Sequence, residues 1–340
     1  MKSTYLKVGL LGALGGMALT LAGCGANLDG TGTTSTIEKV AIPSAQTTIT
    51  DSNQNTVVSE TADSVDGTMG AGGLPLSAVV EQPGAAAFSI FDFAGGRALN
   101  MASQGIGQQQ ALPSALVLTM PCDSGTATMT INVSDPSATT LQAGDSFTMS
   151  FSSCKDNTDG TTLNGSLTAT LDSGTLEQGC GETVQGCGDV TLSMSFNDLQ
   201  ASGMGETVLA DGGFTLTRVG AQDTVSGSDF YLYTTGRGVH LSNFTITSVK
   251  GQSSESVTVS MDLASTRLNG LVTIRTTTAL VTVNGDERPS SGVLEISGAN
   301  SRLTVTALDP NSVQLDLDVG ADGTIDNSAT VTWTDIESTP

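Results

Sequence analysis

The chain has 340 residues, with 34 acidic and 12 basic side chains and a formal net charge of −22 at pH 7. Such a surface repels phosphate backbones and anionic headgroups, which argues against nucleic-acid binding and against electrostatic attachment to a membrane. Charged residues make up 14% and aromatic residues 4% of a chain with 41 glycines, a composition typical of a β-rich exported protein and not of a helical bundle.

The N-terminus has the organisation of an export signal. Lys2 and Lys7 give a positive first region, and an apolar stretch runs from Val8 to Leu19. Small residues then precede Cys24. The apolar stretch is shorter than the roughly 20 residues that a transmembrane helix needs. The segment is therefore interpreted as a signal peptide, not as a membrane span.

The run Leu21-Ala22-Gly23-Cys24 resembles the lipobox of bacterial lipoproteins. The resemblance implies that residues 1–23 are removed and that diacylglycerol is attached to the thiol of Cys24. It also implies the outer membrane as destination, because Gly25 stands where an Asp would signal retention in the inner membrane. Together with its sheet character, the chain resembles β-rich outer-membrane lipoproteins that contact the membrane through an N-terminal lipid. The occupied face of that membrane is left open.

Two segments follow Cys24 before the strands begin. Residues 24–48 are small and polar, which predicts a flexible tether. Residues 49–112 are expected to form a helical cap. Thr50, Asp51 and Ser52 are N-cap candidates for a short helix that ends at Gly67, and apolar residues from Phe88 to Met101 recur at helical spacing in a second one.

From residue 113 to residue 340 the sequence predicts an antiparallel β domain. Val257–Leu263 and Val313–Val319 alternate apolar and polar residues, which places one face of a strand in a core and the other in water. The expected fold is mainly β, an antiparallel meander forming a curved sheet, a half-barrel or a sandwich, with one or two short N-terminal helices.

A weak internal repeat accompanies the alternating segments. Asn164-Gly165, Asp211-Gly212 and Asn269-Gly270 each stand between apolar residues of the same pattern. Asn-Gly and Asp-Gly pairs adopt the positive φ angles of tight hairpin turns or bulges. The pattern indicates a reused hairpin with loops of variable length.

With Cys24 assigned to the lipid, four cysteines remain: Cys122, Cys154, Cys180 and Cys187. An even number in an exported chain indicates two disulfides, for which three connectivities exist. The preferred pairs are Cys180–Cys187, which closes a local loop, and Cys122–Cys154. A zinc site is the alternative, although the chain lacks the close cysteine pairs of such sites.

The segment Asp318-Val-Gly-Ala-Asp322-Gly323-Thr-Ile-Asp326 is the candidate metal site. Asp318, Asp322 and Asp326 resemble the carboxylates of a calcium loop. The segment departs from that pattern at Gly320 and at Ala329, where ligands are expected. The alternative is a hairpin turn at Asp322-Gly323. Apart from a structural calcium ion here, no cofactor is expected.

The sequence contains no recognisable enzyme motif. His240, the chain's single histidine, falls on the polar side of its strand. These features favour a non-catalytic binding or structural module of the cell envelope, with an envelope or extracellular partner. The alternatives are a carrier of an apolar ligand in a half-open β barrel and an envelope hydrolase.

Overall fold

The computed structural model describes residues 37–71, 115–120, 122–135, 140–155, 161–176, 188–203 and 206–338, all within one compact unit. Its elements are α1 (Gln54–Ala71), β1 (Ala115–Met120), β2 (Ser124–Asn132), β3 (Leu141–Gln142), β4 (Ser146–Lys155), β5 (Thr162–Ser173), β6 (Thr175–Leu176), β7 (Val190–Gly203), β8 (Glu206–Val219), β9 (Gln222–Thr234), β10 (Arg237–Lys250), β11 (Ser254–Ser265), β12 (Gly270–Val283), β13 (Ser291–Gly298), β14 (Ser301–Ala307), β15 (Ser312–Val319), β16 (Asn327–Thr332) and α3 (Trp333–Glu337).

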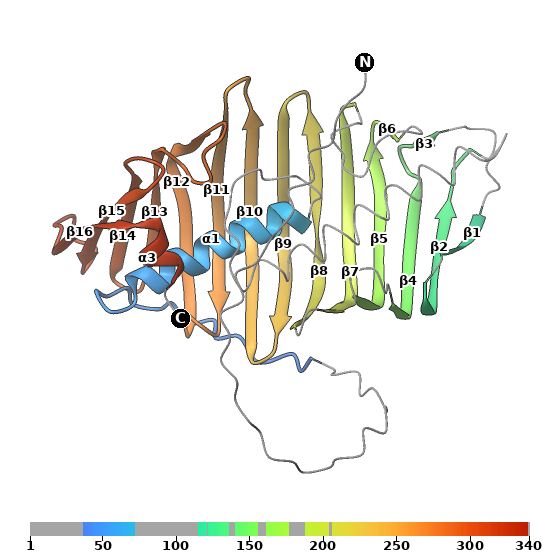
Figure 1. Ribbon diagram of the computed structural model, residues 1–340, viewed down its shortest axis with the longest axis horizontal. Helices are drawn as coiled ribbons and strands as arrows, with labels where there is room; N and C mark the ends of the chain where they lie inside the picture. Colours follow the sequence, from blue (N-terminus) through green and yellow to red (C-terminus); the bar gives the residue numbers. More distant parts are fainter. Residues whose placement is uncertain are drawn as a thin grey trace, which may run out of the picture. The chain divides into compact units, whose positions relative to one another are not determined.

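Fourteen of the strands form one antiparallel sheet in which sequence neighbours pair (Figure 1). The order runs from β1 at one edge to β16 at the other, so the sheet is open, and β3 and β6 form a separate pair. The predicted antiparallel meander is confirmed. Among the described strands it takes the form of one extended sheet and not of a sandwich.

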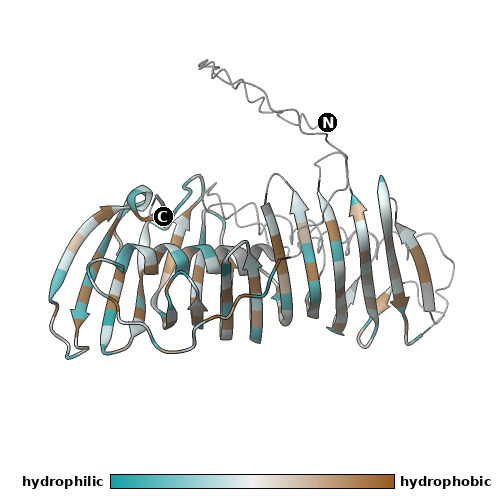
Figure 2. Cartoon of the chain, turned by 90° about the horizontal axis from the view of Figure 1, so that it is seen from below, coloured by the Kyte–Doolittle hydropathy of each residue, from teal (hydrophilic) through white to brown (hydrophobic). Residues whose placement is uncertain are grey.

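Apolar side chains gather on one face, called here the inner face. Along each strand they alternate with polar residues, as the bands of Figure 2 show. In β14 the pattern is strict, with Leu303, Val305 and Ala307 buried between half-buried residues. The rings of Phe196, Phe214 and Phe230 pack at centroid distances of 5.3–5.4 Å near the middle of the sheet. Burial of such side chains is the main force that holds the sheet in its register.

Helix α1 crosses the strands on the inner face and also contacts α3 (Figures 1 and 2). Val57 and Val58 are buried in the core. The helix begins at Gln54 after Asn53, whose side-chain oxygen accepts the N–H of Thr50. It continues past Gly67, where the sequence predicts its end, because a glycine weakens a packed helix without terminating it. The second predicted helix lies outside the described residues.

Residues 37–50 lie along the ends of the strands (Figure 1). The N–H of Thr47 donates to Leu271, and Leu271 in turn donates to the carbonyl of Ala45. Further along, the N–H of Ile49 donates to the hydroxyl of Ser301 at 2.8 Å. The sequence predicts a flexible tether over residues 24–48. Residues 24–36 lie outside the described residues, whereas residues 45–47 pair through their backbone with the start of β12, a pairing that no local sequence pattern predicts.

The Asn-Gly and Asp-Gly repeats take two forms. Gly165 in β5 and Gly212 in β8 have φ angles of +90° and +94° and lie at bulges within strands. Asn269, with φ of +48°, belongs to the turn between β11 and β12 instead. A Cβ atom at Gly165 would lie 2.0 Å from the carbonyl oxygen of Asp198, so only glycine fits there. Both predicted uses of the pair, as turn and as bulge, therefore occur.

A disulfide joins Cys122 to Cys154, with the two Cα atoms 5.4 Å apart. It links the start of β2 to the end of β4, as the sequence predicts. Cys180, Cys187 and Cys24 lie outside the described residues. Within the described ranges, no helix has the length and hydropathy required to cross a bilayer.

Candidate functional site

The face opposite the core, called here the outer face, carries hydroxyl side chains in register across many strands. Each member of the longest row lies directly opposite the next member on the neighbouring strand. The row consists of Ser146, Thr170, Ser193, Thr215, Ser226, Thr245 and Ser260, on β4, β5, β7, β8, β9, β10 and β11. All seven side chains are half-buried or exposed, so a row of hydroxyl groups crosses seven strands without a charge.

Two shorter rows flank the longest one. The first consists of Thr191, Thr217, Thr224, Thr247 and Thr258 on β7 to β11. The second consists of Thr130, Thr148, Thr168 and Ser195 on β2 to β7. Neighbouring strands lie about 4.8 Å apart, and next-but-one residues of a strand roughly twice its rise per residue of about 3.3 Å apart. The three rows, called here the hydroxyl rows, therefore form a lattice of hydrogen-bonding groups.

Some hydroxyl groups of the rows bond to one another. The oxygens of Thr148 and Thr168 lie 3.0 Å apart, and those of Thr224 and Thr247 lie 3.2 Å apart. A hydroxyl group carries one donor and two acceptor lone pairs. Each bonded pair therefore keeps hydrogen-bonding capacity toward solvent or a ligand.

A shallow groove of about 640 Å³ lies within the hydroxyl rows. Its polar walls are formed by Ser193, Thr215, Ser226, Ser228, Asn243 and Thr245. Gly213 also lines the groove, and it stands opposite Ser195 and Asp229 with no side chain to fill the space. Met194, Phe214 and Phe244 also line the groove, which therefore offers hydroxyl and amide groups beside apolar side chains and has no charged side chain in its lining.

Bulges lie beside the groove on β8 and β10, the two strands that flank β9. The pairing register shifts between Gly213 and Thr215 on β8, and between Ser242 and Thr245 on β10. Asn243, inside the second shift, has a φ angle of +50°. A bulge bends its strand and redirects the side chains next to it. The bulges therefore give this part of the outer face a shape that regular strands lack.

Aromatic side chains lie on the outer face next to the groove. The rings of Tyr231 and His240 stack with centroids 4.1 Å apart and planes 2° apart, and Tyr233 stacks on Tyr231 at 6.3 Å. His240 Nε2 lies 3.0 Å from Asp229 Oδ1. This group contains two of the three tyrosines and the only histidine of the chain. His240 therefore lies on the polar face, as predicted, with its side chain 22% exposed.

Lys39 of the N-terminal segment forms ion pairs with β7 and β8 near Tyr233 of this aromatic group. Lys39 Nζ lies 2.6 Å from Asp198 and 2.8 Å from Asp211. Hydrogen bonds to Asp198 and then to Asp211 raise the pKa of Lys39 above its ordinary value. Burial raises the pKa of the Tyr233 hydroxyl. These contacts tie the N-terminal segment to β7 and β8.

The predicted calcium loop connects β15 to β16 and is built on backbone hydrogen bonds. Asp318, which is 2% exposed, accepts the N–H groups of Asp322 and Gly323 at 3.1 and 2.9 Å. Asp326 accepts the N–H of Val319, and Asp322 accepts that of Thr324. Within the described residues, no group of three or more acidic, histidine or cysteine side chains is arranged to hold a metal ion. The three carboxylates therefore accept backbone N–H groups of the segment between β15 and β16.

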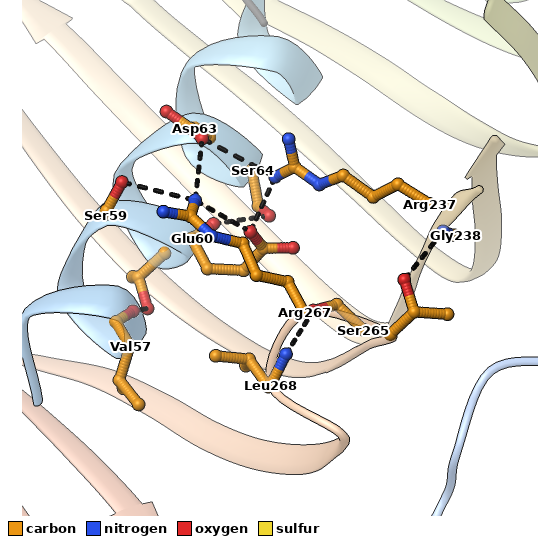
Figure 3. A network of polar contacts seen from close by, with 12 residues as sticks. Val57, Ser59, Glu60, Asp63, Ser64, Arg237, Gly238, Ser265, Arg267 and Leu268 are labelled. Carbon is orange, nitrogen blue, oxygen red and sulfur yellow. Dashed lines mark hydrogen bonds and ion pairs between the residues drawn. The ribbon is translucent and has the colours of Figure 1, made fainter. Parts of the chain in front are cut away.

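Sequence reasoning missed a buried ionic cluster between α1 and the strand ends (Figure 3). Glu60 Oε2 lies 2.5 Å from Arg237 and 3.3 Å from Arg267, and Asp63 lies 3.5 and 3.7 Å from the same two guanidinium groups. The side chain of Glu60 is fully buried. Among the described residues, Glu60 Oε1 and Arg237 Nε have no hydrogen-bond partner. No local sequence pattern predicts this cluster, because its residues come from segments that lie far apart in the chain.

The hydroxyl rows had a signal in the sequence, namely Ser and Thr at the polar positions of the alternating segments. The register that aligns these residues across strands depends on the bulges, and it could not be predicted from the sequence. Comparison of the chain with known protein families, curated proteins and solved structures finds no match.

Proposed function

We propose that the chain is a lipid-anchored, non-catalytic binding module of the cell envelope and that its outer face binds an uncharged polysaccharide. The observation that carries the proposal is the groove of about 640 Å³ within the hydroxyl rows. The lipid at Cys24 and the outer-membrane destination rest on the lipobox resemblance and on nothing else.

The chemistry of the groove favours a polyhydroxylated ligand. Hydroxyl and amide groups both donate and accept hydrogen bonds, as sugar hydroxyl groups do. The lining residues carry no charge, and the chain has a formal net charge of −22, which disfavours an anionic ligand. A sugar ring is comparable in size with the strand separation of about 4.8 Å, so an extended glycan across the strands meets a new hydroxyl group at each one.

The composition of the hydroxyl rows argues against a protein partner at the rows themselves. Protein interfaces concentrate their binding energy in buried Trp, Tyr and Arg anchors, and the hydroxyl rows contain none of these. The inner face is filled by its own packed side chains, as the fully buried Phe230, Met149 and Leu167 illustrate. The outer face is therefore the surface that offers binding groups.

Affinity electrophoresis of the full-length protein in non-ionic detergent tests the binding. Native gels contain a soluble neutral glucan, mannan or galactan, one per gel, and the shift in mobility against polysaccharide concentration gives Kd. The test variant carries Thr215→Val and Thr245→Val, which remove two hydroxyl groups of the groove and keep the side-chain shape. With about 1 kcal/mol per hydrogen bond, Kd should rise by roughly tenfold or more.

The matched control carries Thr304→Val and Thr306→Val, two half-buried threonines of the outer face on β14, beyond the hydroxyl rows. It should bind as the native protein does. Valine suits a strand, so all variants should fold. The proposal fails if no neutral polysaccharide retards the protein, if only an anionic one such as alginate does, or if both double variants bind equally.

Replacement of Cys24 tests the anchor separately. Cys24→Ser should leave the protein soluble or with its leader uncleaved, because lipidation needs the thiol. Stable anchoring requires more than one acyl chain at ~0.8 kcal/mol per buried CH₂, and the described part of the chain holds no helix that could span a membrane in its place. Fractionation of the envelope decides the point: a variant that is still processed and membrane-bound contradicts the lipid anchor and leaves the polysaccharide proposal standing.

A further inference from the structure

The edge strand β1 lacks the features that protect sheet edges. Among the described strands it pairs only with β2, in a continuous register from Ala115 opposite Asn132 to Met120 opposite Ala127. Natural edges are blunted by charged side chains, prolines, bulges or short length. The strand Ala-Leu-Val-Leu-Thr-Met has none of these within its six residues. Within the described residues, no strand pairs with the other backbone edge of β1.

One side chain of β1 is unusually exposed. Val117 is 64% exposed, which is the highest value among the exposed large hydrophobic residues of the described chain. Leu118 points the other way and packs partly against the core. Since exposure of Val117 brings no benefit to an isolated sheet, a contact that covers it would stabilise the protein by removing apolar surface from water.

The charge around β1 suits a second copy of this chain. Residues 115–132, which include β1 and β2, contain a single charged residue, Asp123, although the chain carries a net charge of −22. The opposite edge differs, because the acidic residues Asp316, Asp318, Asp326 and Asp335 lie on or next to β15 and β16. Two copies that approach through β1 therefore avoid the repulsion that they would meet at β16.

We propose that β1 pairs antiparallel with β1 of a second copy, around a two-fold axis at Val117. Directly opposite residues of an antiparallel pair point to the same face of the sheet. A two-fold register centred on Val117 meets this condition: it places Val117 opposite its own copy and Ala115 opposite Thr119. Both copies then turn their inner faces the same way, so the core and the outer face continue across the axis.

Dimerisation of this kind has a defined symmetry. A two-fold contact uses the same surface on both copies and closes after two chains, so it gives a dimer and not a filament. Added strands gain main-chain hydrogen bonds along the whole ladder.

Cysteine cross-linking in intact cells tests the register. Val117→Cys places two thiols opposite each other across the axis, so a dimer that dissociates on reduction should form. The control is Val219→Cys, a valine that is 56% exposed at the end of β8, away from the β1 edge. It should stay monomeric. Absence of a Val117→Cys dimer, or equal dimer from both variants, overturns the register.

Sedimentation of the native full-length protein in density-matched detergent tests the dimer itself. The native protein should dimerise, and Val117→Lys should raise the dimer Kd by at least about tenfold, because like charges directly opposite each other are destabilising. Val219→Lys should dimerise normally. A native protein that is monomeric at tens of micromolar, or a Val117→Lys variant that dimerises as the native protein does, contradicts the proposal.

Discussion

Glu60 of α1 and Arg237 at the start of β10 are 177 residues apart in the chain and form an ion pair of 2.5 Å. Glu60 is fully buried, whereas Arg237 keeps 29% of its side chain exposed. Arg267, from the turn between β11 and β12, reaches the same carboxylate oxygen. One glutamate therefore ties the helix to two neighbouring hairpin ends.

Replacement of Glu60 by Gln should destabilise the protein strongly. It leaves two guanidinium groups facing a neutral side chain, and removal of one partner from a buried ion pair costs about 3–5 kcal/mol. Glu295→Gln is the control, because Glu295 is 34% exposed and lies 3.7 Å from Arg302; it should cost less than about 1 kcal/mol. Urea unfolding at pH 7 measures both free energies of unfolding, and equal losses would contradict the role of Glu60.

Asp63 should behave differently from Glu60, although it belongs to the same cluster. Burial is the main cause that raises the pKa of Asp63, and Arg237 opposes it. A carboxyl group whose pKa is higher in the folded state binds a proton more tightly there, so its contribution to stability grows as pH falls through that pKa. Asp63→Asn removes this titration and should cost less than Glu60→Gln at pH 7.

The measurement for Asp63 is urea unfolding from pH 7 down toward pH 4. The protein with Asp63 should gain stability relative to the Asp63→Asn variant as the pH falls. The reason is that its Asp63 carboxylate takes up a proton in the folded state, whereas the asparagine of the variant cannot. A difference between the two proteins that stays constant with pH, or one that changes in the opposite direction, would show that burial does not dominate at Asp63.

Loss of the Cys122–Cys154 disulfide should lower the free energy of unfolding substantially. The two cysteines are 32 residues apart, and closing a loop of that size contributes roughly 3–4 kcal/mol in the chain-entropy model. The Cys122→Ala, Cys154→Ala double variant should therefore unfold at a lower urea concentration than the native protein, and its free energy of unfolding should be smaller by that amount. Peptide mapping without reductant should find the pair in native protein, and free thiols at these two positions would refute it.

Asp318 should matter for stability without calcium. Asp318→Asn keeps the size of a buried side chain but weakens the acceptance of two backbone N–H groups, which should cost about 1–3 kcal/mol. Millimolar calcium should leave the Tm of the native protein unchanged, because the carboxylates already serve backbone amides. A Tm that rises with calcium after chelation and re-addition would instead establish a binding site at Asp318, Asp322 and Asp326.

The sequence by itself determined the strands, because the alternation of apolar and polar residues is a local property that burial on one face requires. Segments such as Val257–Leu263 and Val313–Val319 lie within β11 and β15, and Cys122–Cys154 is one of the two pairs that the sequence favoured among three possible connectivities. Gly165 and Gly212 indicated positive φ angles in the sequence, because glycine adopts such angles without steric strain.

Only the tertiary structure decided what distant segments do together. The pairing of residues 45–47 with β12, the burial of Glu60 against Arg237 and the register of Thr215 with Ser226 and Thr245 each join segments that are separated in the chain. The physical reason is that a hydrogen bond or an ion pair acts over a few ångströms, whatever the distance along the sequence. Each bulge also shifts the pairing of a strand, so the rows of the outer face exist only once the whole sheet has formed.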